Sequence, residues 1–202
     1  MTERPNALSG CSCGGTDATE AQLRRREVIR IAAAAGAAVA LGPLGTTAAS
    51  ARPAAGDMLV PDDTESNPVA IKAADVQAGK PLLAFPFDPS SKQIRNDSKL
   101  NKIVLVRVAE ADLDADSKAR AAGGVLGFSV VCTHQACDAK TWNAADKALV
   151  CFCHASKFLV LEGGRVLSGP APRALPMLPL KLQGDQLVVA APFTTPPGGA
   201  TS

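Results

Sequence analysis

The sequence predicts an all-β fold, and three observations support this prediction. Short runs rich in β-branched residues recur through the middle of the chain, each bounded by residues that favour turns. Tight turns at Gly163-Gly164 and at Gly184-Asp185 join two pairs of these runs into hairpins. The chain of 202 residues also contains 17 glycines and 15 prolines, as a turn-rich antiparallel fold requires.

The predicted strands follow one another at short intervals, and only residues 110–123 look helical or loop-like. The strands are expected at 102–109 (KIVLVRVA), 125–131 (VLGFSVV), 148–152 (ALVCF), 157–161 (KFLVL), 165–167 (RVL), 179–182 (PLKL) and 186–193 (QLVVAAPF).

The N-terminal region has the order of parts of an export signal. Residues 25–30 (RREVIR) are similar to the twin-arginine motif, and an apolar, alanine-rich run follows at 31–44. Ala49-Ser50-Ala51 then supplies small residues for cleavage after Ala51. We expect a periplasmic protein. An uncleaved signal would instead anchor the protein to the inner membrane.

Composition divides the chain into four parts. Residues 1–51 form the signal segment, 52–70 read as a Pro- and Asp-rich linker, 71–193 as one folded domain, and 194–202 as a disordered tail. A net charge of +2 without a basic stripe argues against a nucleic-acid partner. Cys11 and Cys13 precede the arginines, and no histidine lies near them.

Two short motifs hold both histidines of the chain and four of its six cysteines. They read CTHQAC at 132–137 and CFCHAS at 151–156, and each follows a predicted strand. Two thiolates and two imidazoles suit a tetrahedral zinc ion. They equally suit a [2Fe–2S] cluster in which two histidines bind one of the irons. The candidate ligands are Cys132, His134, Cys151 and His154.

The two motifs resemble the C-T-H-x-x-C and C-P-C-H-x-S motifs of the Rieske [2Fe–2S] family. Residues 169–172 (GPAP) are similar to the Gly-Pro-rich loop that covers the far side of the cluster in that family. The resemblance extends over about 71–193. It implies an antiparallel sheet sandwich with a small, rubredoxin-like cluster-binding subdomain.

The resemblance also implies a role for each residue of the motifs. Cys132 and Cys151 would bind the inner iron, and His134 and His154 the outer, exposed iron. The spare cysteines, Cys137 and Cys153, would form a disulfide between the two loops. Neutral imidazoles in place of thiolates raise the reduction potential to roughly −150 to +300 mV.

Several positions near the ligands distinguish members of the family. Ser156 matches the serine whose hydroxyl donates to a bridging sulfide, and Gly169 and Pro170 match the covering loop. Phe158 stands where high-potential members carry a tyrosine, which predicts a lower potential. Gln135 is polar where quinol-oxidising members carry an apolar residue.

These features predict an electron-transfer subunit without independent catalysis. The chain is loosely similar to the small subunit of arsenite oxidase, so a molybdenum-containing subunit is the expected donor and a cytochrome c or copper protein the expected acceptor. The alternative is the Rieske subunit of a quinol–cytochrome c oxidoreductase, with a cytochrome b partner. A zinc-stabilised binding module remains a remote alternative. An oxygenase would need two further histidines for its mononuclear iron, and the chain has none.

Overall fold

The structure is a computed structural model that describes residues 52–199. The predicted export signal, Cys11, Cys13 and the last three residues lie outside the described part. Within 52–199, no helix is both long enough and apolar enough to cross a membrane.

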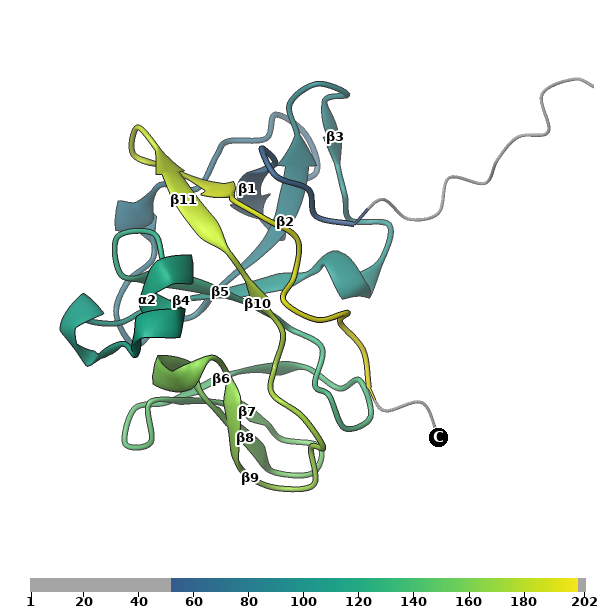
Figure 1. Ribbon diagram of the computed structural model, residues 1–202. Helices are drawn as coiled ribbons and strands as arrows, with labels where there is room; N and C mark the ends of the chain where they lie inside the picture. The colour runs from purple at the N-terminus through teal and green to yellow at the C-terminus, as the bar shows by residue number, and fades with distance from the viewer. Residues whose placement is uncertain (1–51, 200–202) are drawn as a thin grey trace, which may run out of the picture. The chain divides into compact units, whose positions relative to one another are not determined.

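The larger of two antiparallel sheets closes on itself (Figure 1). Its strands run in the order β10-β5-β4-β2-β1-β12-β11, with β3 paired to β2. Because only Pro179 separates β10 from β11, one segment of chain lies at both ends of this path. The strands are β1 (Met58–Pro61), β2 (Leu82–Asp88), β3 (Gln93–Ile94), β4 (Ile103–Arg107), β5 (Val125–Ser129), β10 (Met177–Leu178), β11 (Leu180–Gln183) and β12 (Gln186–Val189).

The smaller sheet is an antiparallel meander inserted between β5 and β10. The insertion leaves and rejoins the larger sheet at one place, where the Ser129 N–H donates to the Pro176 carbonyl at 2.8 Å. Both cysteine–histidine motifs belong to this insertion, so one short segment positions them together. Its strands are β6 (Ala139–Asn143), β7 (Ala148–Cys151), β8 (Ser156–Leu159) and β9 (Arg165–Ser168).

Helical structure is sparse and lies mainly in the connections. The α2 helix (Ala115–Arg120) begins at Asp114, whose carboxylate accepts a hydrogen bond from the Ser117 N–H at 2.7 Å. It falls within the only region that the sequence predicted to be helical or loop-like. The single-turn 3₁₀ helices are η1 (Ala73–Asp75), η2 (Lys99–Asn101), η3 (Glu110–Asp112) and η4 (Val160–Glu162).

The buried side chains form two clusters. One lies within the larger sheet and includes Leu59, Ile103 and Leu187. The other joins the two sheets, since Phe128 of β5 and Phe158 of β8 both belong to it and are fully buried. The apolar core of this second cluster includes Cys132 and Cys151, so burial of the sheets also buries two of the candidate ligands.

Residues 52–70 belong to the folded domain and are not a linker. The β1 strand lies between β2 and β12, and its Leu59 is 0% exposed. The neighbouring Pro and Asp residues obscured this short strand in the sequence. The β2 strand escaped prediction for a related reason, because Pro86 lies inside it and proline usually interrupts strands.

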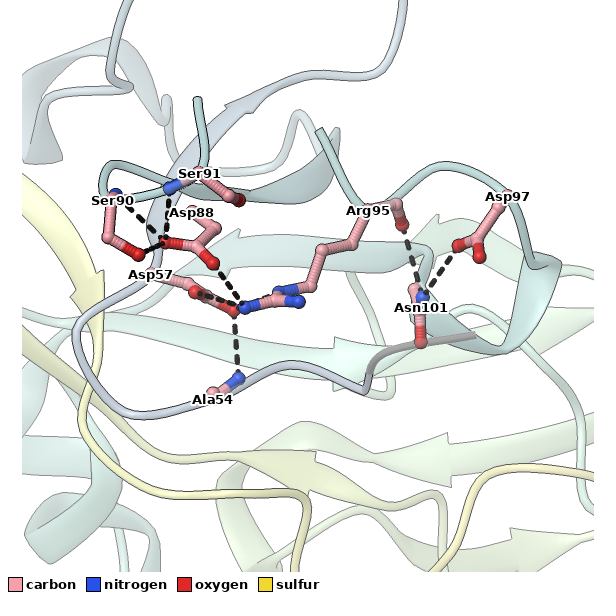
Figure 2. Close-up of polar contacts among 8 residues, drawn as sticks. All are labelled: Ala54, Asp57, Asp88, Ser90, Ser91, Arg95, Asp97 and Asn101. Carbon is pink, nitrogen blue, oxygen red and sulfur yellow. Dashed lines mark hydrogen bonds and ion pairs between the residues drawn. The ribbon is translucent and has the colours of Figure 1, made fainter. Parts of the chain in front are cut away.

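An ion pair between the buried Asp57 and the partly buried Arg95 fastens the start of the domain to the sheet (Figure 2). The Arg95 guanidinium donates to both carboxylate oxygens of Asp57, at 2.8 and 3.2 Å, and to Asp88 at 3.1 Å. Asp57 also accepts a hydrogen bond from the Ala54 N–H at 2.8 Å. Arg95 thereby connects the segment before β1 to β2 and β3.

The C-terminal segment also differs from its prediction. Over 194–199 the chain is hydrogen-bonded to the domain, beginning with the Thr194 N–H, which donates to the Met177 carbonyl at 2.9 Å. Its Thr, Pro and Gly composition is typical of disorder, but backbone and side-chain partners elsewhere in the domain hold it in place.

Candidate metal centre

The first motif forms a tight loop after β5. The Cys132 N–H donates to the Cys137 carbonyl at 2.8 Å, and the Ala136 N–H donates to the Cys132 carbonyl at 3.1 Å. Ala136 adopts a left-handed conformation, with φ of 59°. The loop therefore turns sharply and presents His134 at its tip.

The second motif is the hairpin loop between β7 and β8. Cys151 ends β7 directly opposite Ser156, which begins β8. Between them Ala155 has a left-handed φ of 57°, and the Phe152 side chain is 76% exposed. The hairpin therefore holds Cys151 inside the domain while it carries His154 to the surface.

The four candidate ligands divide into an inner and an outer pair. Cys132 and Cys151 are 1% and 2% exposed, whereas His134 is half-buried and His154 is exposed. The centroids of the two imidazole rings lie 4.6 Å apart, and the rings are nearly perpendicular, at 89°. The two thiols are thus buried, whereas the two imidazoles lie side by side and are more exposed.

The residues fit a metal cofactor. His134 Nδ1 is buried without a hydrogen-bond partner among the described residues, which is costly unless this atom binds a metal. Burial raises the pKa of the Cys132 thiol and the neighbouring Cys151 raises it further, although the backbone N–H of His134 and the Ser156 hydroxyl lower it. A bound cation reverses this balance, because a coordinated thiol loses its proton.

A disulfide joins the two loops, as the family resemblance implied. Cys137 and Cys153 are bonded, with their Cα atoms 6.4 Å apart. The Cys151 sulfur lies within 4.8 Å of both disulfide sulfurs. Since Cys132 and Cys151 are the free thiols of the described chain, the pairing leaves one cysteine in each loop for a metal.

The third loop packs directly against Ser156. Gly169 has a φ of +93°, and a Cβ atom at this position would lie 2.5 Å from the Ser156 Cα. The Ala171 N–H donates to Ser156 Oγ at 3.2 Å, and Pro170 is exposed beside it. Only glycine fits here, so the Gly-Pro loop closes over the buried Ser156.

Comparison with known proteins shows the family. Residues 69–179 match the family model of the Rieske [2Fe–2S] domain. The chain belongs to the Rieske family. The predicted all-β fold and the [2Fe–2S] cofactor are thereby confirmed, because the Rieske domain binds this cluster.

Two relatives of this Rieske chain carry names of different kinds. A Haloferax mediterranei protein named "Putative respiratory nitrate reductase subunit Rieske" is 32% identical and covers 95% of this chain and 92% of its own length. A Mycobacterium bovis protein named "Cytochrome bc1 complex Rieske iron-sulfur subunit" is 30% identical over 68% of this chain. This chain spans only 36% of that relative's length.

One solved structure similar to this chain is the ferredoxin of carbazole 1,9a-dioxygenase from Nocardioides aromaticivorans IC177. It covers 62% of this chain and 99% of its own, with 19% identity and a TM-score of 0.41.

The positions that distinguish members of the Rieske family differ in burial. Phe158 is fully buried on β8, opposite Leu149 of β7, and belongs to the same core cluster as Cys132 and Cys151. Gln135 is exposed beside His134. Trp142 is half-buried and packs against the core cluster.

Two residues at the Rieske centre escaped the sequence reasoning. Lys99 Nζ donates to the Ala136 carbonyl at 2.9 Å and pairs with Asp138 at 2.7 Å. The Arg173 carbonyl accepts a hydrogen bond from Thr133 Oγ1 at 2.7 Å. Lys99 lies far from the motifs in sequence. Arg173 directly follows the 169–172 loop, but its backbone carbonyl makes the contact, so no pattern of residue types could have indicated it.

Proposed function

We propose that this Rieske domain transfers single electrons through a [2Fe–2S] cluster held by four ligands. They are Cys132, Cys151, His134 and His154. The main support for this proposal is the unequal burial of these ligands, with the thiols inside and the imidazoles nearer the surface. That arrangement protects one side of a cluster from water and leaves the other accessible to a protein partner.

The chain's own residues hold and tune this centre. When bound, the cluster supplies a one-electron redox couple. The two thiolates balance its positive charge, and the Ser156 hydroxyl near Cys132 adds a hydrogen-bond donor that favours the more negative, reduced form. The disulfide keeps the two loops together, and the exposed His154 edge provides a short path for an electron to leave.

We expect the donor to be a molybdenum-containing oxidoreductase subunit of the arsenite-oxidase type, and the acceptor a cytochrome c or copper protein. Two observations support this proposal over a quinol donor. The exposed tip of the first loop carries the polar Gln135. A relative that covers 95% of this chain is named as a putative respiratory nitrate reductase subunit, and not as a subunit of a cytochrome bc1 complex.

The alternative is a Rieske subunit of a quinol–cytochrome c oxidoreductase. The names of several relatives favour it, including a Streptomyces lividans protein that is 28% identical over 79% of this chain and 95% of its own length. Docking at a quinone site would have to accommodate Gln135, together with the exposed Phe152 of the second loop.

Export through the twin-arginine route fits this proposal, because that route carries folded proteins and a cluster is assembled before export. The periplasmic location and any membrane anchoring rest on residues 1–51, which lie outside the described part of the chain.

Electron paramagnetic resonance of the dithionite-reduced protein tests the cofactor assignment. We expect an iron–sulfur signal coupled to nitrogen nuclei of two imidazoles. The Cys132→Ser variant should lose the signal, whereas Cys11→Ser, which changes a cysteine outside both motifs, should keep it. A protein that contains zinc and gives no cluster signal would overturn the proposal.

Purification from the native host tests the choice of donor. Molybdenum in the co-purifying material supports the first proposal, and b-type haem supports the alternative. Cross-linking before lysis retains weak complexes, so that one of the two cofactors is recovered with its subunit.

A further inference from the structure

The first ligand loop is held from outside by the C-terminal segment. We propose that residues 194–199, here called the C-terminal strap, fix the His134 loop, and that Arg173 is the positioning residue that fastens the strap. The inference rests on the proposed function, because it concerns the loop that would carry a histidine ligand. It identifies residues outside all three family motifs that fix the position of a ligand loop.

Arg173 contacts the strap at three points. Its Nη1 donates to Thr195 Oγ1 at 3.2 Å, and its Nη2 donates to the carbonyls of Pro196 and Gly198 at 3.0 and 2.9 Å. A planar guanidinium supplies several donors in a fixed geometry, which suits this multiple contact. The strap begins at Thr194, which exchanges two hydrogen bonds with the backbone of Met177.

The end of the strap lies against the backbone of the first loop. A Cβ atom on Gly199 would lie 2.9 Å from the His134 carbonyl oxygen, 3.1 Å from the Ala136 nitrogen and 3.3 Å from the Gln135 Cα. Such close approach is possible because Gly199 has no side chain. The strap therefore covers one side of the segment 134–136.

Two other contacts hold the same loop from different directions. The Lys99 ammonium donates to the Ala136 carbonyl, and the Thr133 hydroxyl donates to the Arg173 carbonyl. Arg173 thus acts on the loop twice, through its backbone on Thr133 and through its side chain on the strap. A substitution of the Arg173 side chain removes only the second action.

The consequence concerns both rigidity and access. With the strap in place, the His134 loop cannot open without the loss of the Arg173 contacts. A partner would meet the centre from the His154 side, where the second hairpin exposes its side chains. Loss of the strap would admit water beside His134, and water favours the reduced cluster because that form carries more negative charge.

Hydrogen exchange of the cluster-loaded protein provides the test, with three variants. They are Arg173→Ala, Arg173→Lys and a chain that ends at Thr194. We expect Arg173→Ala and the truncation each to increase exchange at the 134–136 amides about tenfold, since each removes the hydrogen bonds between Arg173 and the strap. Arg173→Lys should restore part of the protection, because one ammonium can still contact a strap carbonyl.

The double variant distinguishes positioning from a general loss of stability. In the truncated chain, Arg173→Ala should add almost nothing, because the strap through which it acts is already gone. Arg165→Ala is the matched control, since it removes an equal charge from an exposed pair with Glu162 in the small sheet. It should leave exchange at 134–136 unchanged.

The reduction potential gives a second readout. The truncation should raise the potential, because it admits water beside His134 and leaves the Arg173 charge in place, whereas Arg165→Ala should leave the potential unchanged. Unchanged exchange in the truncated chain, or additive effects in the double variant, would overturn the inference. Failure of the proposed function would appear separately, as a protein that never acquires the iron–sulfur signal.

Discussion

At the scale of single residues, individual side chains near the candidate metal centre are expected to set its reduction potential. Phe158 is buried in the same core cluster as the motif cysteines, at the position where high-potential family members carry a tyrosine. We expect Phe158→Tyr to raise the reduction potential by roughly 40 mV. This is the shift expected if the new hydroxyl donates a hydrogen bond to a ligand sulfur and stabilises the reduced cluster by about 1 kcal/mol. A redox titration measures the shift. Phe158→Leu is the control without a donor, and an equal shift in that variant would rule out the hydrogen bond as the cause.

Gly169 shows how one missing side chain permits a loop to close. The Gly169→Ala variant should lose at least about 2 kcal/mol of unfolding free energy, because its Cβ would collide with the Ser156 backbone. Gly184 is the matched control, since it also has a positive φ but a Cβ atom there would meet nothing within 4 Å. Gly184→Ala should cost only about 1 kcal/mol of backbone strain. Urea denaturation gives both values, and equal losses would contradict the close-contact explanation.

The candidate ligands could be selected from the sequence because metal-binding side chains cluster at short spacings. The four candidate ligands lie within two motifs of six residues each, and the disulfide followed from the resemblance. Lys99, Arg173 and Gly199 could not be predicted in this way. They reach the first loop only after the chain has folded, and a backbone carbonyl or a close approach leaves no signature in residue types.

At the scale of elements, the ion pair of Arg95 holds the start of the domain against β2 and β3. Arg95→Met should destabilise the protein by about 3 kcal/mol, because it leaves the buried Asp57 carboxylate without its partner. Arg165→Met removes an exposed pair with Glu162 and should change stability by less than about 1 kcal/mol. Thermal unfolding of both variants measures the difference. A second substitution, Asp57→Asn, should recover part of the loss, and its failure to do so would weaken this explanation.

Strands with uninterrupted apolar character were predictable, and interrupted ones were not. The β4, β5, β7 and β12 strands coincide with β-branched runs, and the hairpin at Gly184-Asp185 joins β11 to β12 as expected. The β1 and β2 strands include or adjoin prolines and acidic residues, which hide their pattern. Their strand conformation depends on partners that are distant in sequence, such as β12 for β1.

At the scale of the whole molecule, the folded unit needs the chain before residue 71. A chain that begins at Arg52 should fold and bind the cluster, whereas one that begins at Ile71 should not fold stably. The shorter chain lacks β1 and so loses the burial of Leu59 and Val60, each worth about 1.5–3 kcal/mol, and the pairing with two neighbours. Circular dichroism and iron content measure the outcome. A stable, iron-loaded chain from Ile71 would show that β1 is dispensable.

The way the smaller sheet enters and leaves the larger one has an evolutionary consequence. Residues 130–176 depart from β5 and return at β10, which are paired neighbours, so the insertion begins and ends at one point of a closed sheet. Such a segment can be exchanged, lengthened or redesigned as a cassette while the sheet that receives it keeps its register. Selection can thus change the redox chemistry of the cassette and the partner-binding surface of its host separately, and one architecture can serve several electron-transport chains.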